Sequence, residues 1–429
     1  MKLIFFLLIF TFAVTANLCA QHAALSGVLF NEAAYFDVAQ ASLYNPHNRL
    51  LHLHNRSNVL AVEVNTNLRF TAWFSLQSTL QTRLESARTS ESKLLLRELF
   101  VKLAPASALD LTFGRAILKW GAGYAYNPTG VIEPRRNPSD TSDRLRRFRG
   151  IDLAQADFYF RASALTLVYL NTLQTDARWQ FANDHRLALR MSTRFRGFDM
   201  ALIGFWEKQR RGKLGFNFTK VLGAALEIHG EFLGQRGSDA PQHLIVAVNT
   251  PDTLFRFPPF APLHAHQRRL FGQYLAGFQY TFGGKINLAM EYFHNDENIG
   301  GKDWRRFFDY VLFANRQLSN PRWTTPQGHL AAANLLWAAG VFSNTGATRD
   351  YLFVRLYSAD LAATRISGEL NVLENLHDAS AVVIPTLSVY LGREISAYLR
   401  WSGFCGKRQS EFGGLLYRSV TNIGMSWKF

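Results

Sequence analysis

The strongest constraint on the fold of this chain is a hydrophobic period of two in segments of about ten residues. In the segment 186–195 (RLALRMSTRF), apolar residues occupy most alternate positions, and three arginines lie on the opposite face. The same alternation recurs in 197–207, 285–293 and 394–401. Because side chains alternate in direction along a β-strand, each segment has one apolar and one polar face. The sequence therefore predicts an all-β protein whose strands separate an apolar from a polar environment.

The chain begins with the features of a secreted protein. A basic second residue precedes an apolar run that is too short to span a bilayer, and small residues surround Ala20. This pattern predicts a signal peptide over residues 1–20, cleaved after Ala20, so that residues 21–429 form the mature chain. A lipoprotein site at Cys19 is the alternative. The bulky side chain of Leu18, directly before that cysteine, favours simple cleavage.

Composition narrows the class of exported protein. The formal charge falls from +15 to +14 when Lys2 is removed, and aromatic residues make up 14% of the chain. Cys405 is the single cysteine left in the mature chain, so a disulfide within it is excluded. After residue 20 no apolar run reaches the length of a membrane-spanning helix. Two classes remain: an exported soluble β-protein and an outer-membrane β-barrel.

The connections between the alternating segments favour the barrel. One set is short and comprises residues 65–67, 105–108, 196–197, 222–224, 283–285 and 392–394. The other set is long and comprises residues 80–94, 118–150, 172–185, 235–267, 296–349 and 405–415. Outer-membrane barrels have short turns on one side of the membrane and longer loops on the other. A soluble sandwich would also alternate along its strands, but it would not need this asymmetry between its connections.

The end of the chain carries a more specific pattern. In TNIGMSWKF, the residues Ile423, Met425, Trp427 and Phe429 alternate with polar or small ones. This segment resembles the closing strand of bacterial outer-membrane β-barrels, which ends in a phenylalanine. The resemblance implies that the barrel-assembly machinery recognises the strand that ends in Phe429. It extends to the signal peptide and to the rhythm of the strands, and it identifies a porin-like class without indicating one function.

Counting the segments predicts a single transmembrane antiparallel up-and-down β-barrel of about 18 strands. An even number places both ends of the chain on the side of the short turns. Sixteen strands is the alternative, because the segments 25–36, 59–66 and 331–342 are ambiguous. The expected long outer loops are residues 118–150, 235–267 and 296–349. A barrel of this size leaves an aqueous lumen unless a loop fills it.

The polar faces of the strands are expected to line that lumen. They carry both signs of charge, but Arg186, Arg190 and Arg194 form one basic ridge along a single strand. Charges that line a lumen set its preference among ions. We therefore predict that this ridge belongs to a pore or to an anion-binding wall. The alternative is that these arginines form ion pairs or are solvated inside a wide barrel.

The link 118–150 is the most unusual segment of the chain. The stretch GR-x4-WG-x-G followed by NPTG resembles a segment of several porin-like families, in which it leads from a strand into the lumen. Loops of this length are usually functional or disordered. If it folds inward, its bases narrow the pore and favour anions; if it stays outside, they bind lipopolysaccharide phosphates. We favour the inward placement for the predicted pore or anion-binding residues, which are Arg115, Lys119, Arg135, Arg136, Arg144, Arg146, Arg147 and Arg149.

Other kinds of chemistry lack support in the sequence. The GxSxG, GxxxxGK[ST], HExxH and CxxC motifs do not occur, so we do not expect an enzyme, a cofactor or a metal site. The pair His52 and His54 and the pair His264 and His266 have no carboxylate or cysteine clustered with them. An N-terminal plug domain does not fit, because the strands begin near residue 25. A nucleic-acid partner does not fit the expected compartment.

The expected function is passive diffusion of small hydrophilic solutes, with a preference for anionic ones, across the outer membrane of a Gram-negative-type bacterium. The alternative is a barrel that binds or exports an acidic polysaccharide, as capsule-assembly or alginate-export barrels do. A transporter of hydrophobic substrates is disfavoured by the polar inner face. The expected partners are membrane lipid, lipopolysaccharide, small anionic solutes or acidic glycans, and further copies of the chain in a homo-oligomer.

Overall fold

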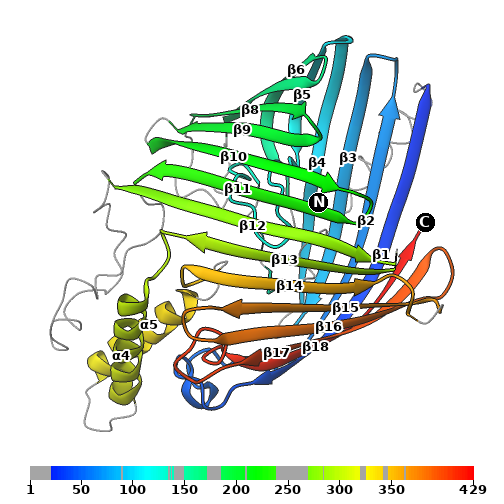
Figure 1. The fold of residues 1–429 in the computed structure, drawn as a ribbon. Coiled ribbons are helices and arrows are strands. Elements are labelled where there is room, and N and C mark those ends of the chain that lie inside the picture. The colour runs from blue at the N-terminus through cyan, green and yellow to red at the C-terminus, as the bar shows by residue number, and fades with distance from the viewer. Residues whose placement is uncertain are drawn as a thin grey trace.

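The protein is an all-β barrel in which each strand follows its neighbour in sequence order (Figure 1). The computed structural model describes residues 21–87, 90–133, 136, 138–139, 149–171, 185–207, 210–237, 269–283, 285–318, 325–341, 346–361 and 364–429. The strands are β1 (His22–Val38), β2 (Arg56–Arg69), β3 (Phe74–Ser86), β4 (Ser90–Ala106), β5 (Leu109–Ala116), β6 (Ile151–Phe160), β7 (Ser163–Asn171), β8 (His185–Phe195), β9 (Phe198–Glu207), β10 (Arg210–Leu222), β11 (Leu226–Arg236), β12 (Leu270–Phe282), β13 (Ile286–Asn295), β14 (Asp350–Ser358), β15 (Ile366–Asn375), β16 (Ser380–Tyr390), β17 (Ile395–Cys405) and β18 (Tyr417–Lys428).

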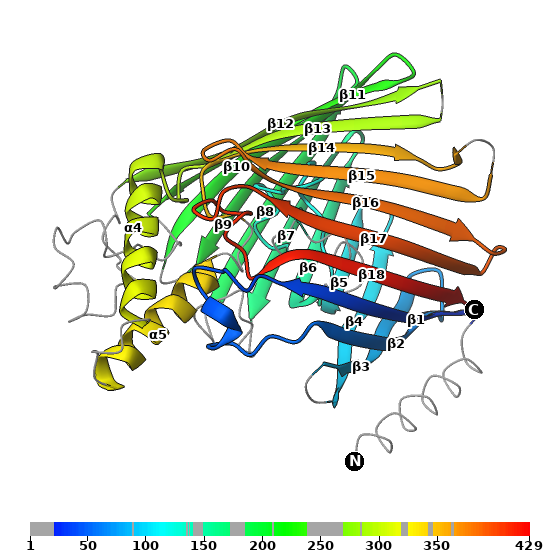
Figure 2. The ribbon, with the colours of Figure 1, turned by 90° about the horizontal axis from the view of Figure 1, so that it is seen from below.

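The sheet closes on itself between its first and last strands. Each strand pairs antiparallel with the next, and β1 pairs with both β2 and β18. At this seam the backbones of Gly27 and Phe429 exchange two hydrogen bonds of 2.7 and 3.0 Å. Figure 2 shows β1 and β18 side by side. The prediction of an antiparallel up-and-down barrel with 18 strands is confirmed, and the count of sixteen is excluded.

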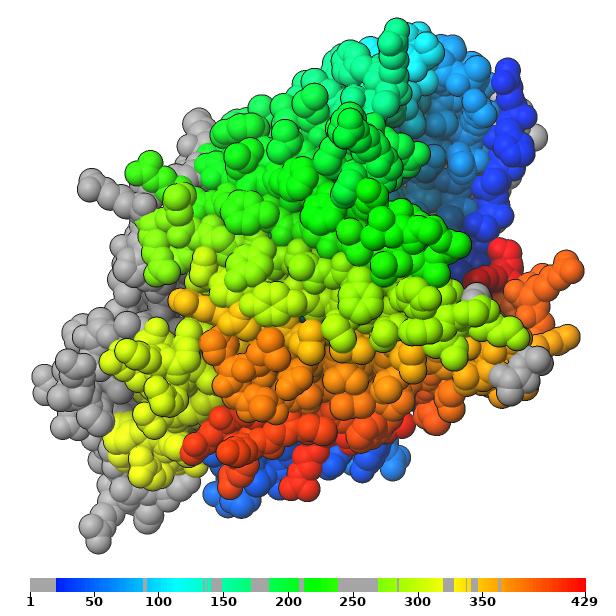
Figure 3. All heavy atoms as spheres, in the orientation of Figure 1, coloured from blue at the N-terminus to red at the C-terminus, as the bar shows by residue number. Residues whose placement is uncertain are grey.

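The two faces of the strands are divided as their alternation predicts. Leu187 and Met191 of β8 are about half exposed, whereas Arg186 and Ala188, on either side of Leu187, are buried. Apolar side chains that the chain leaves uncovered lie on the outside, where a membrane barrel presents them to lipid. In the space-filling view the strands from β9 to β16 follow one another as bands around this outer surface (Figure 3). The polar face therefore points inward.

Two of the predicted connections were wrong. Residues 65–67 (NTN) are not a turn, because β2 continues through them to Arg69. Residues 80–94 are mostly strand, since β3 continues to Ser86 and β4 begins at Ser90. In both places polar residues resembled a loop, although their alternate positions are simply the inward face of a strand. The other short turns lie where the sequence placed them.

The connection between β13 and β14 contains two helices that the sequence analysis did not predict. They are α4 (Gly301–Leu318) and α5 (Thr325–Val341), so the ambiguous span 331–342 falls on a helix. Both helices lie at the long-loop end of the barrel (Figure 1). Trp304 and Phe307 of α4 stack with ring centroids 5.5 Å apart. Among the described residues, no helix has the length and apolar character needed to cross a membrane.

The long loops are tied together at this end around one buried carboxylate, that of Glu411, which lies between β17 and β18. Its oxygens accept hydrogen bonds from the Tyr351 hydroxyl at 2.6 Å, the Asn375 amide at 2.7 Å and the Ala347 backbone at 3.0 Å. Loss of solvation raises the pKa of the Glu411 carboxyl to about 7. The nearby 3-10 helix η1 (Pro46–Asn48) belongs to the loop between β1 and β2. The long-loop end is thus a packed cap.

Candidate functional site

The chain enters the barrel directly after β5. The backbone N–H of Ile117 donates to Oε1 of Glu98 on β4 at 3.0 Å. From there the described loop residues 117–133 run along the inner wall, and both ribbon views show this trace within the ring of strands (Figures 1 and 2). The described part of this loop therefore has the inward placement, one of the two that the sequence left open. We call residues 117–133 the inner loop.

Glu231 of β11 holds the middle of the inner loop. Its buried carboxylate accepts hydrogen bonds from the backbone N–H of Gly123 at 2.6 Å and of Thr129 at 2.8 Å. The Thr129 hydroxyl donates to the same carboxylate at 2.7 Å. On β10, the Asn217 amide donates to the Trp120 carbonyl and to the Thr129 hydroxyl, at 2.8 and 2.7 Å. Glu231 of the wall therefore accepts hydrogen bonds from loop N–H groups that are not paired in a β-sheet.

Glu291 of β13 repeats this arrangement one step along the loop. Its carboxylate is 1% exposed and accepts hydrogen bonds from the backbone N–H groups of Tyr124 and Ala125. The buried His229 ring of β11 lies 2.8 Å from the same carboxylate through Nε2. Hydrogen bonds to a charged acceptor are stronger than neutral ones. Glu231 and Glu291 together therefore anchor the loop to neighbouring parts of the wall.

A third carboxylate belongs to the loop itself. Glu133 accepts hydrogen bonds from the backbone N–H groups of Trp120 and Gly121, and from the Asn127 amide at 3.0 Å. Arg136 donates to this carboxylate at 3.4 Å and to the carbonyl of Tyr124 at 3.3 Å. These contacts close the loop on itself. Arg136, one of the predicted pore residues, thus donates hydrogen bonds to the loop backbone and to Glu133.

Aromatic packing completes the seat of the inner loop. The Tyr126 ring stacks on Phe293 of β13, with centroids 4.0 Å apart and planes at 11°. The Tyr124 ring lies 5.8 Å from Phe353 of β14. Next to it, the guanidinium of Arg355 lies 4.8 Å from the Tyr124 ring centre, a cation–π distance. Trp120 and Ile132 are buried in one cluster with residues of β6 to β9, so the loop covers the wall from β6 to β14.

The remaining loop bases are dispersed. Arg115, at the end of β5, is buried and pairs with Asp152 of β6 through two contacts of 2.8 and 2.6 Å. Lys119 and Arg149 are exposed. The predicted residues Arg135, Arg144, Arg146 and Arg147 lie outside the described residues. The structure therefore does not gather the described loop bases into one cluster.

The three arginines of β8 all point inward but differ in their surroundings. Arg186 is buried and pairs with Glu207 of β9 at 2.6 Å. Arg194, near the short turn, pairs with Asp199 at 2.6 Å while remaining exposed. Arg190 lies between them, and its buried Nε makes no hydrogen bond within the part of the chain that the structure describes. Of the three, Arg190 is therefore the one without an ion pair among the described residues.

The sequence analysis missed the residues that hold the inner loop. The polar faces of the strands were expected to line the lumen, but Glu231 and Glu291 were not singled out as anchors of a loop. The hydrogen bonds that Glu231 accepts join residues about a hundred positions apart in the sequence, so no local motif marks them. The sequence did contain one indication of this anchor, namely acidic residues on the polar faces of two strands whose other faces are apolar. In the described ranges no group of three or more His, Cys, Asp or Glu side chains could hold a metal ion.

Comparison with known proteins identifies the fold. No protein-family model and no curated protein matches the sequence. OccAB1 of Acinetobacter baumannii aligns with a TM-score of 0.57 and 11% identity, over 96% of this chain and 97% of that chain. OccK11 (OpdR) of Pseudomonas aeruginosa gives 0.55 and 11%, over 95% and 96%, and OccK5 (OpdH) gives 0.54 and 9%, over 96% and 99%. This chain therefore has a porin-like outer-membrane β-barrel fold.

Proposed function

We propose that the protein is an outer-membrane channel through which small hydrophilic solutes diffuse passively, with a preference for anions. The observation that carries the proposal is the inner loop, which is held along one half of the wall of a closed barrel with a polar inner face. A loop fixed to the wall narrows a lumen without requiring any chemistry. Selection then depends on the width of the remaining passage and on the charges beside it.

The route for solutes follows from where the loop lies. The inner loop covers the wall from β6 to β14, so the passage runs along the opposite wall, formed by β15 to β18 and β1 to β5. The expected anion preference rests on the net positive charge of the chain and on inward-facing bases such as Arg190. Arg115 and Arg186 contribute less to it, because carboxylates within 3 Å offset their charges.

Recording in a planar bilayer with a salt gradient tests both parts of the proposal. We expect a steady conductance and a reversal potential that favours chloride over potassium. The variant Arg190→Gln should reduce the chloride preference. Lys220→Gln is the matched control, because Lys220 lies on the outer face against the Phe198 ring and should leave selectivity unchanged. A protein that shows no conductance but is retained on an acidic glycan such as alginate would support the polysaccharide-binding alternative.

The remaining expectations about the mature protein are part of the same proposal. Cleavage after Ala20 would leave Gln21 as the first residue, which the mass of the protein in isolated membranes measures directly. The exposed bases of the long-loop end would contact lipopolysaccharide, and the closing strand would be recognised by the assembly machinery through Phe429. Chemical cross-linking in the membrane tests for a homo-oligomer.

A further inference from the structure

A patch of the inner wall near the short-turn end differs in chemistry from the rest. Four neighbouring strands, β1 to β4, place Ser26, Asn65, Thr79 and Glu98 in one continuous cross-strand row. The pairing registers show that each of these residues lies opposite the next. Next to Ser26 and Glu98, the side chains of Leu25 and Leu99 point the other way and are exposed on the outer surface, so the row faces the lumen.

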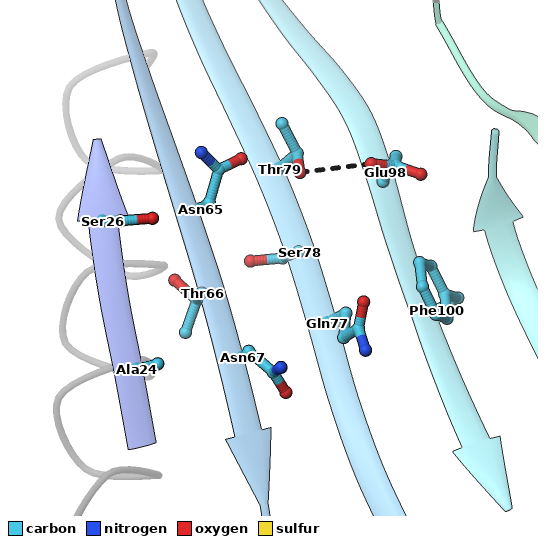
Figure 4. Close-up of a pocket in the computed structure, with 10 residues that line it drawn as sticks. All are labelled: Ala24, Ser26, Asn65, Thr66, Asn67, Gln77, Ser78, Thr79, Glu98 and Phe100. Carbon is cyan, nitrogen blue, oxygen red and sulfur yellow. Dashed lines mark hydrogen bonds between the residues drawn. The ribbon is translucent and has the colours of Figure 1, made fainter. Parts of the chain in front are cut away.

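A second row lies one step closer to the turns and contains Ala24, Asn67, Gln77 and Phe100. The two rows border a hollow of about 390 Å³, and Figure 4 shows their side chains beside it. This volume is within the roughly 300–1,000 Å³ typical of small-molecule sites. We call these two rows the neutral wall.

The side chains of the neutral wall match one class of solute. Amide and hydroxyl groups each donate and accept hydrogen bonds, as the hydroxyls of a sugar or polyol do. Glu98 is the only formally charged residue among the ten described residues that line the hollow. Its carboxylate accepts hydrogen bonds from the Thr79 hydroxyl at 3.3 Å and from the Ile117 backbone. A lone carboxylate repels anions, so this wall does not share the anion preference proposed for the lumen.

The charged groups beside the neutral wall are two ion pairs and Arg69 of β2, which is exposed and donates to the Ala72 carbonyl at 3.4 Å. Toward the long-loop end, Arg97 forms an ion pair with Glu63, and both side chains are largely buried. Toward the short turns, Lys102 pairs with Asp110 at 2.7 Å. Opposite charges this close largely cancel at a distance. A solute at the neutral wall therefore meets mainly hydrogen-bonding groups and one aromatic edge, that of Phe100.

We propose that the neutral wall is a binding subsite for a neutral polyhydroxylated solute the size of a mono- or disaccharide. The proposal extends the channel function, because the wall lies on the side of the lumen that the inner loop leaves uncovered. It names a solute class that net charge alone would not indicate. Weak, reversible binding here raises the local concentration of such solutes on their way through the barrel.

Saturation-transfer NMR with maltose tests the subsite on the whole protein in detergent micelles, without requiring a conducting pore. We expect saturation transfer from the wild type to maltose. The affinity for maltose should fall about tenfold in the double variant Asn67→Leu and Gln77→Leu, because two hydrogen-bonding amides are lost. Asn287→Leu is the matched control: Asn287 faces the lumen from β13, where its amide donates to Thr281. It should bind maltose as the wild type does.

Bilayer recording separates this inference from the proposed function. Millimolar maltose should block the current reversibly in the wild type and in Asn287→Leu, and about tenfold less effectively in the double variant. Absence of conductance together with maltose binding in micelles would overturn the channel and leave the subsite standing. Conductance without maltose binding, equal binding by the double variant, or tighter binding of glucuronate than of maltose would each overturn the subsite.

Discussion

At the scale of single residues, an inward-facing arginine has two kinds of surroundings in this barrel. The Arg186 side chain is fully buried against Glu207, whereas the Arg194 side chain is 73% exposed beside Asp199. Losing one partner of a buried ion pair leaves an uncompensated charge, which costs about 3–5 kcal/mol. An exposed pair contributes about 0–1 kcal/mol. The same residue type on one strand therefore has a structural role at one end and little effect at the other.

The first prediction compares these two arginines. Arg186→Met should lower the free energy of unfolding by about 3 kcal/mol, because it removes one partner of a buried ion pair. Arg194→Met should change it by less than about 1 kcal/mol. Urea titration of the folded barrel in lipid vesicles, read by the mobility shift of folded and unfolded forms, measures both. Equal losses in the two variants would mean that burial does not determine the role of these residues.

At the scale of elements, the inner loop is held by acceptors from the wall and not by a sheet of its own. Glu231 and Glu291 receive backbone N–H groups from four loop residues, and aromatic stacking adds to this seat. A buried N–H that loses its acceptor costs about 1–3 kcal/mol. The loop should therefore be docked cooperatively, and it should leave the wall when both carboxylates are altered.

The second prediction tests this docking. In the double variant Glu231→Gln and Glu291→Gln, an NH2 group replaces one acceptor oxygen of each carboxylate. This NH2 group then faces a backbone N–H of the loop, so we expect the loop to detach. Hydrogen exchange at residues 123–129 should accelerate by at least tenfold, since about 1.4 kcal/mol corresponds to that factor. Single-channel conductance should rise as the passage widens. Glu227→Gln, on the same strand but partly exposed, is the control. Unchanged exchange in the double variant would contradict the role of the carboxylates.

The cap at the long-loop end gives a third prediction, which concerns pH. Burial raises the pKa of Glu411 to about 7 from an ordinary value of 4.5. The docked cap therefore binds the proton more tightly than the open one, and it loses stability as the pH rises from about 4.5 through 7. Limited proteolysis of the long loops should be slower at pH 5.5 than at pH 8. Glu411→Gln should remove this difference, and Glu394→Gln, at a short turn, should keep it.

At the scale of the whole molecule, closure depends on one seam between β1 and β18. Gly27 lies opposite Phe429, and the Phe429 ring occupies the space that a side chain at Gly27 would need. A barrel has no free strand edge only while this seam is paired. The last residue of the chain thus contributes to closure through its backbone and through its ring.

The fourth prediction separates these two contributions. Deleting Phe429 should reduce the folded fraction more than Phe429→Ala, because the deletion also removes two backbone hydrogen bonds to Gly27. Phe282→Ala is the control, since Phe282 is as exposed as Phe429 but ends a strand away from the seam. The folded fraction in isolated outer membranes, read by heat-modifiable mobility, measures all three. A deletion no worse than Phe282→Ala would contradict the importance of the seam.

The sequence by itself determined the barrel and the direction of each face, and it predicted about eighteen strands with sixteen as the alternative. These features are local, because a period of two assigns every side chain to a face once the strand is recognised. It misread Asn65 and Asn67 as part of a turn, since polar residues on an inward face have the composition of a loop. Their pairing with Ser26 and Gln77, which makes the neutral wall, is visible only in the folded sheet.

Only the tertiary structure decided where the inner loop lies and which arginines are buried in ion pairs. The contacts that settle both join different strands, as Glu231 does with Gly123 and Arg186 with Glu207. Chain closure and strand tilt bring such residues together, and a linear pattern does not contain that geometry. The period of two therefore accounts for the wall of this protein, whereas the passage through it is a product of the folded barrel.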